Sequence, residues 1–173
     1  ECLSKGRSRV PAARRASYRN CWHSHQARSP RRRSWLSCAP MSVERLTYLD
    51  SSAIVKLVEV APESMALRQY LRRRRPYISS ALARTEVMRA LLPLGPEAIR
   101  RGQEVLLNIA LVRVNDRVLS LAGDRLPPSL RSLDAIHLAT ARLLGGSLAR
   151  LVTYDERMLI AARQMGVAVA SPG

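Results

Sequence analysis

The chain has 173 residues, of which 29 are Lys or Arg and 13 are Asp or Glu, so its formal net charge is +16. Because 47% of the residues are apolar, the chain has enough material for one buried core, which excludes a globally disordered chain and a fibrous repeat. The longest unbroken apolar run, residues 158–162, is too short to cross a bilayer, and the positive charge favours a polyanionic partner such as nucleic acid.

The first 40 residues differ in composition from the rest of the chain. They hold ten basic side chains, one acid, all three cysteines and both tryptophans, and they show no sustained apolar periodicity. We expect a basic, disordered arm over residues 1–40 and a globular domain over residues 41–173. The arm is interpreted as an RNA-binding tail, as an organelle-targeting segment or, in the interpretation that we favour, as residues upstream of a natural start at Met41.

The cysteines indicate little about the domain itself. Cys21, His23, His25 and Cys38 carry zinc-ligating atoms, but their spacing matches no standard zinc finger, so we do not expect a zinc site there. Because no cysteine follows Cys38, the domain has no disulfide, which favours an intracellular, reducing compartment.

From residue 46 onward, strand and helix patterns alternate. In chain order, we expect a strand at 46–49, helices at 53–58 and 63–73, a strand at 77–78, helices at 83–94 and 96–108, a strand at 110–114, helices at 116–123 and 133–144, a strand at 151–153, a helix at 156–165 and a strand at 167–169. Ser132 is expected to cap the helix at 133–144, and Gly145 to end it. Strands separated by helices predict a three-layer α/β/α sandwich around a mainly parallel sheet.

Several carboxylates fall where this topology is expected to bring its strand ends together. Asp50 follows a predicted strand directly, and Asp155 follows the predicted strand at 151–153 after one intervening residue. Asp134 lies in the first turn of a mostly apolar helix, and Glu86 lies in the helix after the second strand. Ligands of open parallel sheets bind beyond the carboxyl ends of the strands, so these acids are candidates for one site. Each also has a structural explanation, as a helix cap, as a partner of a helix dipole or, for Glu86, in an ion pair with Arg89.

Four segments resemble the successive motifs of the PIN-domain ribonucleases, and most closely those of the VapC toxins of bacterial VapBC toxin–antitoxin pairs. They are residues 48–53 (YLDSSA), 85–87 (TEV), 132–141 (SLDAIHLATA) and 151–155 (LVTYD). The third segment is the most specific of them. The resemblance covers residues 46–169 and none of the arm.

The resemblance implies an endoribonuclease that depends on Mg²⁺ or Mn²⁺, forms a homodimer, and is held inactive by a cognate VapB-like antitoxin in the cytoplasm of a bacterium. It implies that an acidic quartet surrounds the metal ion, formed by Asp50, Glu86, Asp134 and Asp155. Such residues suit the reaction, because phosphodiester cleavage develops negative charge that a divalent cation offsets. Since packed carboxylates repel one another, at least one of the four should have a raised pKa when no metal is bound.

Other residues near these motifs have less certain roles. Ser52 and Thr153 stand at positions that often bear a hydroxyl in the family, and the resemblance implies that they help to position water or metal. Glu156 follows Asp155 directly, so either acid is a candidate for the fourth position. His137 lies on a nearly apolar helix, where a packed or hydrogen-bonded histidine is more common than a general base.

Substrate contacts are expected from basic side chains rather than from aromatic ones. The candidates for RNA binding are Arg72, Arg73, Arg74, Arg75, Arg84 and Arg89. The alternative for the run at residues 72–75 is a solvated helix end. Four tyrosines and no phenylalanine or tryptophan follow Met41, which favours a structured RNA loop read by its shape and backbone.

Two other functions are compatible with the same fold. A haloacid-dehalogenase-like phosphatase also begins with an Asp after its first strand, but it requires a second Asp where this chain has Ser52. A catalytically silent RNA- or partner-binding module would keep the fold without the chemistry. Release of RNA fragments that depends on magnesium distinguishes the nuclease from the silent module.

Overall fold

The structure, a computed structural model, describes residues 45–173. Its strands are β1 (Leu46–Leu49), β2 (Tyr77–Ser80), β3 (Ala110–Val112), β4 (Leu148–Val152) and β5 (Val169–Ala170). Its α-helices are α1 (Ser51–Val58), α2 (Ser64–Leu71), α3 (Ala83–Leu91), α4 (Pro96–Leu107), α5 (Asp116–Asp124), α6 (Ser132–Leu143) and α7 (Glu156–Gln164). The predicted arm and the Cys and His residues weighed for zinc lie outside the described residues, so the predictions about them are untested.

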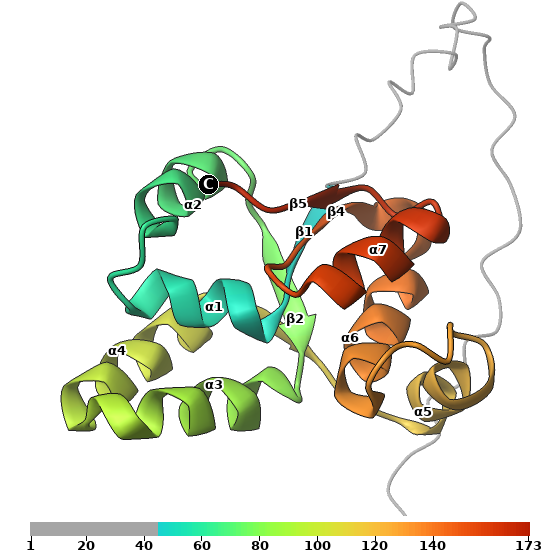
Figure 1. Cartoon of the computed structure of the whole chain (residues 1–173), viewed down its shortest axis with the longest axis horizontal. Coiled ribbons are helices and arrows are strands. Elements are labelled where there is room, and N and C mark those ends of the chain that lie inside the picture. Colours follow the sequence, from blue (N-terminus) through green and yellow to red (C-terminus); the bar gives the residue numbers. More distant parts are fainter. Residues whose placement is uncertain (1–44) are drawn as a thin grey trace, which may run out of the picture. The chain divides into compact units, whose positions relative to one another are not determined.

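The five strands form one parallel sheet in the order β3-β2-β1-β4-β5. From β1 the chain adds β2 and β3 on one side and then crosses back to add β4 and β5 on the other side. Helices α1 to α4 lie together on one side of the sheet in Figure 1, and α6 and α7 lie on the other, with α5 against α6. The predicted α/β/α sandwich with a parallel sheet is therefore confirmed.

Alternating side chains of the two central strands supply two separate cores. Leu49 of β1 and Val152 of β4 pack against α1, α2, α3 and α4. Their neighbours Tyr48 and Leu151 point to the opposite face and pack against α6 and α7. Successive strand residues face opposite sides, so a sheet covered on both faces needs apolar side chains on both sides of its strands, as Tyr48 and Leu49 provide in β1. Each leucine that is fully buried in these cores contributes about 2–3 kcal/mol to folding.

Several predicted boundaries differ from the structure by a few residues, and for three of them the hydrogen bonds or strand pairing show the cause. Strand β4 begins at Leu148 rather than at residue 151, because Leu148 already pairs with Leu46 of β1. Ser132 is the first residue of α6 and not its cap, since Arg131 occupies the cap position without a side-chain hydrogen bond. The last strand begins at Val169 rather than at residue 167, because the backbone N–H of Val167 still donates to the end of α7.

The order of the strands places a topological switch point between β1 and β4. The two neighbouring strands continue into helices on opposite faces of the sheet, and in open parallel sheets ligands bind beyond the carboxyl ends of the strands at such a point. Asp50 follows β1 at this point, and Asp155 follows β4 after two intervening residues. Within residues 45–173, no helix is long and apolar enough to cross a membrane.

Candidate active site

Asp50 is fixed at the switch point by donors from two elements. Its side chain is almost fully buried, and its backbone N–H donates to the carbonyl of Val152 over 3.0 Å. The Oδ2 atom accepts hydrogen bonds from the hydroxyls of Ser52 (2.7 Å) and Thr153 (2.9 Å), and a longer one from the backbone N–H of Ser52 (3.3 Å). Asp50 is thus the cap of α1, as the structural explanation predicted, and its carboxylate also contacts Thr153, the residue that follows β4.

The two predicted hydroxyl residues act on this carboxylate directly. Ser52 and Thr153 both donate to Asp50, and their hydroxyl oxygens are 3.4 Å apart. The backbone N–H groups of Tyr154 and Asp155 donate to these hydroxyls in turn. The loop after β4 is therefore tied to the start of α1 by side-chain hydrogen bonds that converge on one carboxylate.

Glu86 is paired with a histidine and not with Arg89. Its Oε2 atom lies 2.6 Å from Nε2 of His137 and accepts a hydrogen bond from the hydroxyl of Ser51 over 2.5 Å. Burial tends to raise the pKa of Glu86, but the hydrogen bonds from His137 and Ser51 outweigh it and hold the pKa below its usual value. Glu86 is therefore an anion whose position is set by residues of α6 and α1.

His137 links three elements of the site. It is 1% exposed, and its two ring nitrogens contact Glu86 of α3 and the hydroxyl of Tyr48 in β1, the latter over 2.8 Å. Burial tends to lower the pKa of His137, but the hydrogen bond that its ring donates to Glu86 and the charges of Asp50 and Glu86 raise the pKa overall. The ring therefore takes part in a buried hydrogen-bond network with Glu86 and Tyr48, which is the hydrogen-bonded role expected for it and not that of a free general base.

Asp134 is the least satisfied acid of the group. Its Oδ2 atom is buried and has no hydrogen-bond partner within the part of the chain that the structure describes. Burial raises the pKa of its carboxyl, the negative charges of Asp155 and Asp50 raise it further, and Arg131 opposes the rise. This is the raised pKa expected of packed carboxylates, and it means that the negative charge at this edge is not fully balanced by the surrounding protein.

Asp155 caps α7 and also acts on Asp134. Its Oδ1 atom accepts a hydrogen bond from the backbone N–H of Met158 over 2.9 Å. Among the charges that raise the pKa of Asp134, that of Asp155 is the largest, whereas Glu156 is exposed and is not among the main causes. Of the two candidates for the fourth acid, Asp155 is therefore the one that faces the other carboxylates.

The structure brings the predicted acids to one edge of the sheet in two connected groups. Asp50, Asp134 and Asp155 influence one another electrostatically, and Glu86 is joined to them through His137. As these side chains lie, no three Asp, Glu, His or Cys residues within 45–173 form a group that could hold a metal ion. The donor set nevertheless fits one, because carboxylate oxygens are the ligands that Mg²⁺ and Mn²⁺ prefer and one of them is buried without a partner.

The predicted RNA-binding arginines divide between two places. Arg84 and Arg89 are exposed on α3, the helix that carries Glu86. Residues 72–75 lie between α2 and β2, before the amino end of β2, whereas the acids lie beyond the carboxyl ends of the strands. The structure therefore separates the four-arginine run from the acidic edge.

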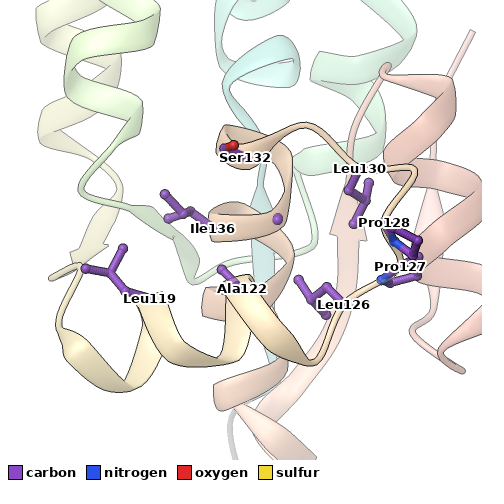
Figure 2. A pocket seen from close by; sticks show the side chains of 10 residues that line it. Leu119, Ala122, Leu126, Pro127, Pro128, Leu130, Ser132 and Ile136 are labelled. Atoms are coloured by element: carbon purple, nitrogen blue, oxygen red, sulfur yellow. The ribbon is translucent and has the colours of Figure 1, made fainter.

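An apolar groove borders this edge without adding a titratable group to it. It has a volume of about 310 Å³ and lies between α5, the loop that follows α5, and α6. Figure 2 shows Leu119 and Ala122 of α5 below Ile136 of α6, with Leu126 and Leu130 of the loop along the groove. Its lining in the described part of the chain is uncharged, so the chemistry belongs to the acids.

The comparison with known proteins assigns the family. A sequence model of the PIN domain matches residues 47–164, a range that contains all four candidate acids. The chain belongs to the PIN-domain family. Among the relatives of this PIN domain, ribonuclease VapC46 of Mycobacterium tuberculosis is 61% identical over 125 residues, which are 72% of this chain and 96% of VapC46. The predicted family and activity, those of a VapC-type endoribonuclease toxin, are therefore confirmed.

Two solved structures share the fold of this PIN domain. VapC20 of Mycobacterium tuberculosis, a toxin that cleaves the sarcin-ricin loop, superimposes with a TM-score of 0.59 at 15% identity and covers 73% of this chain and 99% of its own. A chain of a toxin–antitoxin complex from Klebsiella pneumoniae superimposes with a TM-score of 0.54 at 21% identity, covering 73% and 98%. At these identities the likeness concerns the fold alone.

Sequence reasoning missed how the PIN domain holds Glu86. The pattern paired this acid with Arg89, three residues away on the same helix, whereas its partners are Ser51 and His137, which are far away in sequence. The sequence likewise did not indicate that the hydroxyl of Tyr48, in the first of the family-like segments, contacts His137. The spacing of residues within one segment carries no signal for contacts of this kind.

Proposed function

We propose that this ribonuclease depends on Mg²⁺ or Mn²⁺ held at the acidic edge by Asp50, Asp134, Asp155 and Glu86. The observation that carries the proposal is the buried Oδ2 atom of Asp134, which has no hydrogen-bond partner among residues 45–173. The charges of Asp155 and Asp50 raise the pKa of the same carboxyl. A cation at this point would balance the charge that the protein leaves uncompensated.

The residues of the chain would prepare this site in distinct ways. The hydroxyls of Ser52 and Thr153 donate to the Asp50 carboxylate and fix its direction. Ser51 and His137 hold Glu86 in the same manner, and Asp155 is oriented by its capping bond to α7. A divalent cation bound there supplies the positive charge that stabilises a phosphodiester group as it is cleaved.

The RNA would be held by its backbone around the acidic edge. Arg84 and Arg89 are exposed on α3 beside Glu86, and Arg131 is close enough to Asp134 to lower its pKa. Guanidinium groups at these places can contact phosphates on either side of the cleaved bond. Because few aromatic side chains are available for stacking on bases, we propose a structured RNA loop as the substrate.

A cognate antitoxin and a second copy of the chain complete the proposal. The VapC relatives and the toxin–antitoxin complex that shares the fold support a VapB-like protein as the partner that keeps the enzyme inactive. We propose that the active form is a homodimer in the bacterial cytoplasm. The domain carries no cysteine that would need an oxidising compartment.

The proposal is tested by comparing Asp134→Asn with Asp116→Asn. Both substitutions remove one carboxylate from the first turn of a helix, but Asp116 is exposed on α5 and has no part in the site. We expect Asp134→Asn to reduce RNA cleavage by about 100-fold or more, and Asp116→Asn to change it less than twofold. Purified protein, a structured RNA and gel mapping of the RNA ends measure the rates.

Removal of the metal provides the second arm of this test. We expect EDTA to abolish cleavage by the wild-type protein, and excess Mg²⁺ or Mn²⁺ to restore it. Cleavage that is unaffected by EDTA would contradict the metal dependence. Wild-type protein that binds RNA with metal present but releases no fragments would instead support the silent binding module.

A further inference from the structure

A second basic region of the molecule is built differently from a solvated helix end. It consists of Tyr70 and residues 72–75 after α2, Tyr77 at the start of β2, and Arg150 in β4, and we call it the arginine–tyrosine surface. It lies toward the amino ends of the strands, because Tyr77 and Arg150 both pair with Thr47 near the start of β1. Asp50, just beyond the end of β1, is three residues after Thr47 and therefore about 10 Å from it in the direction of the strands.

Two arginines of this surface are fixed against the same tyrosine. The guanidinium carbon of Arg74 lies 3.8 Å from the centroid of the Tyr70 ring, and the group also donates to the backbone carbonyl of Tyr70. Arg150 donates to the Tyr70 hydroxyl over 2.6 Å. Stacking and hydrogen bonding of this kind restrict the guanidinium groups, so less conformational entropy is lost when they bind a further partner.

The neighbouring arginine is arranged in the same way. The guanidinium carbon of Arg75 lies 5.2 Å from the centroid of the Tyr77 ring. The hydroxyl of Tyr77 donates to the backbone carbonyl of Leu71 over 2.7 Å, which fixes the ring. The surface therefore contains two similar arginine–tyrosine pairs at the end of α2, Arg74 over Tyr70 and Arg75 over Tyr77.

The charge of this surface is not balanced by carboxylates. Within residues 45–173, none of Arg72, Arg73, Arg74, Arg75 and Arg150 lies within ion-pair distance of an acid. Elsewhere in the same part of the chain, Arg100 is paired with Glu97 and Glu104. Like charges held together without partners destabilise a fold, and an anion bound among them removes that cost.

We propose that the arginine–tyrosine surface binds the phosphate backbone of the RNA that is cleaved at the acidic edge, as a separate contact on a neighbouring part of the molecule. This inference rests on the proposed function for the identity of the RNA. The planar donors of arginine match phosphate oxygens, and contacts to phosphate hold a nucleic acid in position without reading its sequence. The surface thus contributes to affinity for a long, structured RNA and takes no part in the chemistry.

The test compares Arg74→Ala/Arg150→Ala with Arg100→Ala/Arg101→Ala in the full chain. Each double variant loses two positive charges, but Arg100 and Arg101 lie on α4 and outside the arginine–tyrosine surface. Binding is measured in an Asp134→Asn background by fluorescence anisotropy, with a labelled RNA hairpin at several salt concentrations. We expect the first variant to bind about tenfold more weakly at ~0.1 M salt, with a salt slope smaller by about 1–2, and the control to change less than twofold.

Cleavage of a short RNA keeps this inference distinguishable from the proposed function. With Asp134 intact, Arg74→Ala/Arg150→Ala should cleave an RNA dinucleotide at the wild-type rate, because its single phosphodiester group occupies the acidic edge and leaves no phosphate for the arginine–tyrosine surface. If wild-type protein cleaves no RNA, the proposed function is wrong, but the difference in hairpin affinity between the two double variants still tests the arginine–tyrosine surface. If the alanine variant does not fold, Arg74→Gln/Arg150→Gln removes the charges with less loss of packing.

Three further outcomes decide the identity of the ligand. If both double variants bind the RNA hairpin with the same affinity, the proposal is wrong. If Arg74→Ala/Arg150→Ala weakens binding to duplex DNA of the same length as much as it weakens binding to the RNA hairpin, the surface recognises the phosphate backbone in general, as proposed. A loss of affinity for an acidic peptide such as polyglutamate, without any loss for RNA, would overturn the proposal and identify the surface as a protein-docking site.

Discussion

At the residue scale, the acids of the candidate site differ in how well the protein satisfies them. Asp50 has two hydroxyl donors, Glu86 has a histidine and a hydroxyl, and Asp155 has a backbone donor. Asp134 alone among these four carboxylates has a buried oxygen without a partner in the described residues. Since an ionised carboxylate needs donors or a cation, the stability of the folded state should depend on metal mainly through Asp134.

The first prediction concerns Asp134→Asn without divalent ions. The folded state raises the pKa of Asp134, so the stability that this group contributes is present below its unfolded pKa and is lost as the pH rises through the folded one. We therefore expect the Asn variant to have a higher Tm than wild type at pH 7, and the advantage to vanish below about pH 4. Thermal unfolding in EDTA from pH 3 to pH 8 measures both quantities.

Addition of Mn²⁺ should reverse this order. A ligand that binds only the folded state raises its stability with concentration, so the wild-type Tm should increase with Mn²⁺ while that of Asp134→Asn changes much less. The exposed substitution Asp116→Asn should respond as wild type does. An equal response of the Asp134 and Asp116 variants would show that Asp134 is not a ligand.

A second prediction concerns the buried histidine. His137→Ala leaves the Tyr48 hydroxyl and the Glu86 carboxylate without their partner, and we expect it to lower the free energy of unfolding by about 3 kcal/mol. His137→Gln keeps a donor that can reach Glu86, so its loss should be smaller and its cleavage rate closer to wild type. Denaturant unfolding and RNA cleavage of both variants, well below their Tm, measure the two effects.

At the element scale, two helices begin with acids that serve both the helix and the site. Asp50 caps α1 and Asp155 caps α7, so the structural explanation of these residues is correct as far as it goes. Asp50 also accepts a hydrogen bond from Thr153 after β4, and the charge of Asp155 raises the pKa of Asp134. A capping residue can therefore also belong to the proposed metal site, and substitutions can separate the two roles.

The third prediction separates the two roles of Asp155. Asparagine accepts the same hydrogen bond from the backbone N–H of Met158, so Asp155→Asn should keep the stability of α7 and reduce cleavage by about tenfold or more. Asp155→Ala should lose the cleavage rate and in addition about 1 kcal/mol of stability. Unchanged cleavage in Asp155→Asn would leave the residue with a capping role alone.

The matched cap on α5 serves as the control. Asn115 accepts a hydrogen bond from the backbone N–H of Val118 over 3.1 Å, away from the acidic edge. We expect Asn115→Ala to cost about 1 kcal/mol of stability and to leave cleavage unchanged. A loss of cleavage in this variant would indicate that destabilisation by itself reduces activity.

The elements themselves were predictable because their signals are local. The apolar run of β1, the proline that opens α4 and the glycine after α7 each act within a few residues. The start of β4 was predicted three residues too late, because Leu148 is extended through its pairing with β1 rather than through its own sequence. Boundaries set by a distant strand cannot be read from the segment alone.

At the scale of the whole molecule, charge is distributed unevenly over the fold. The acids gather beyond the carboxyl ends of the strands, while the arginine–tyrosine surface lies toward their amino ends. A polyanion that contacts both would therefore run along the direction of the strands. This arrangement allows affinity for RNA and cleavage of RNA to be altered by different substitutions.

The fourth prediction concerns residues 1–40. Both cores lie within the described residues, and the PIN-domain match covers residues 47–164. We expect a chain that starts at Met41 to fold and to cleave RNA at a rate within about threefold of the full chain, with weaker overall binding because ten basic side chains are removed. Circular dichroism and cleavage of the same RNA measure this, and loss of folding would assign the arm to the domain.

The sequence by itself determined the order of strands and helices, the two-faced apolar pattern that requires a covered parallel sheet, and the four acids in family-like segments. These features depend on residues close together in the chain, where spacing has direct physical meaning. Only the tertiary structure decided that Glu86 pairs with His137, that Asp155 rather than Glu156 acts on Asp134, and that residues 72–75 lie away from the acidic edge. Each of these depends on which distant segments the sheet places side by side, and no local spacing encodes that.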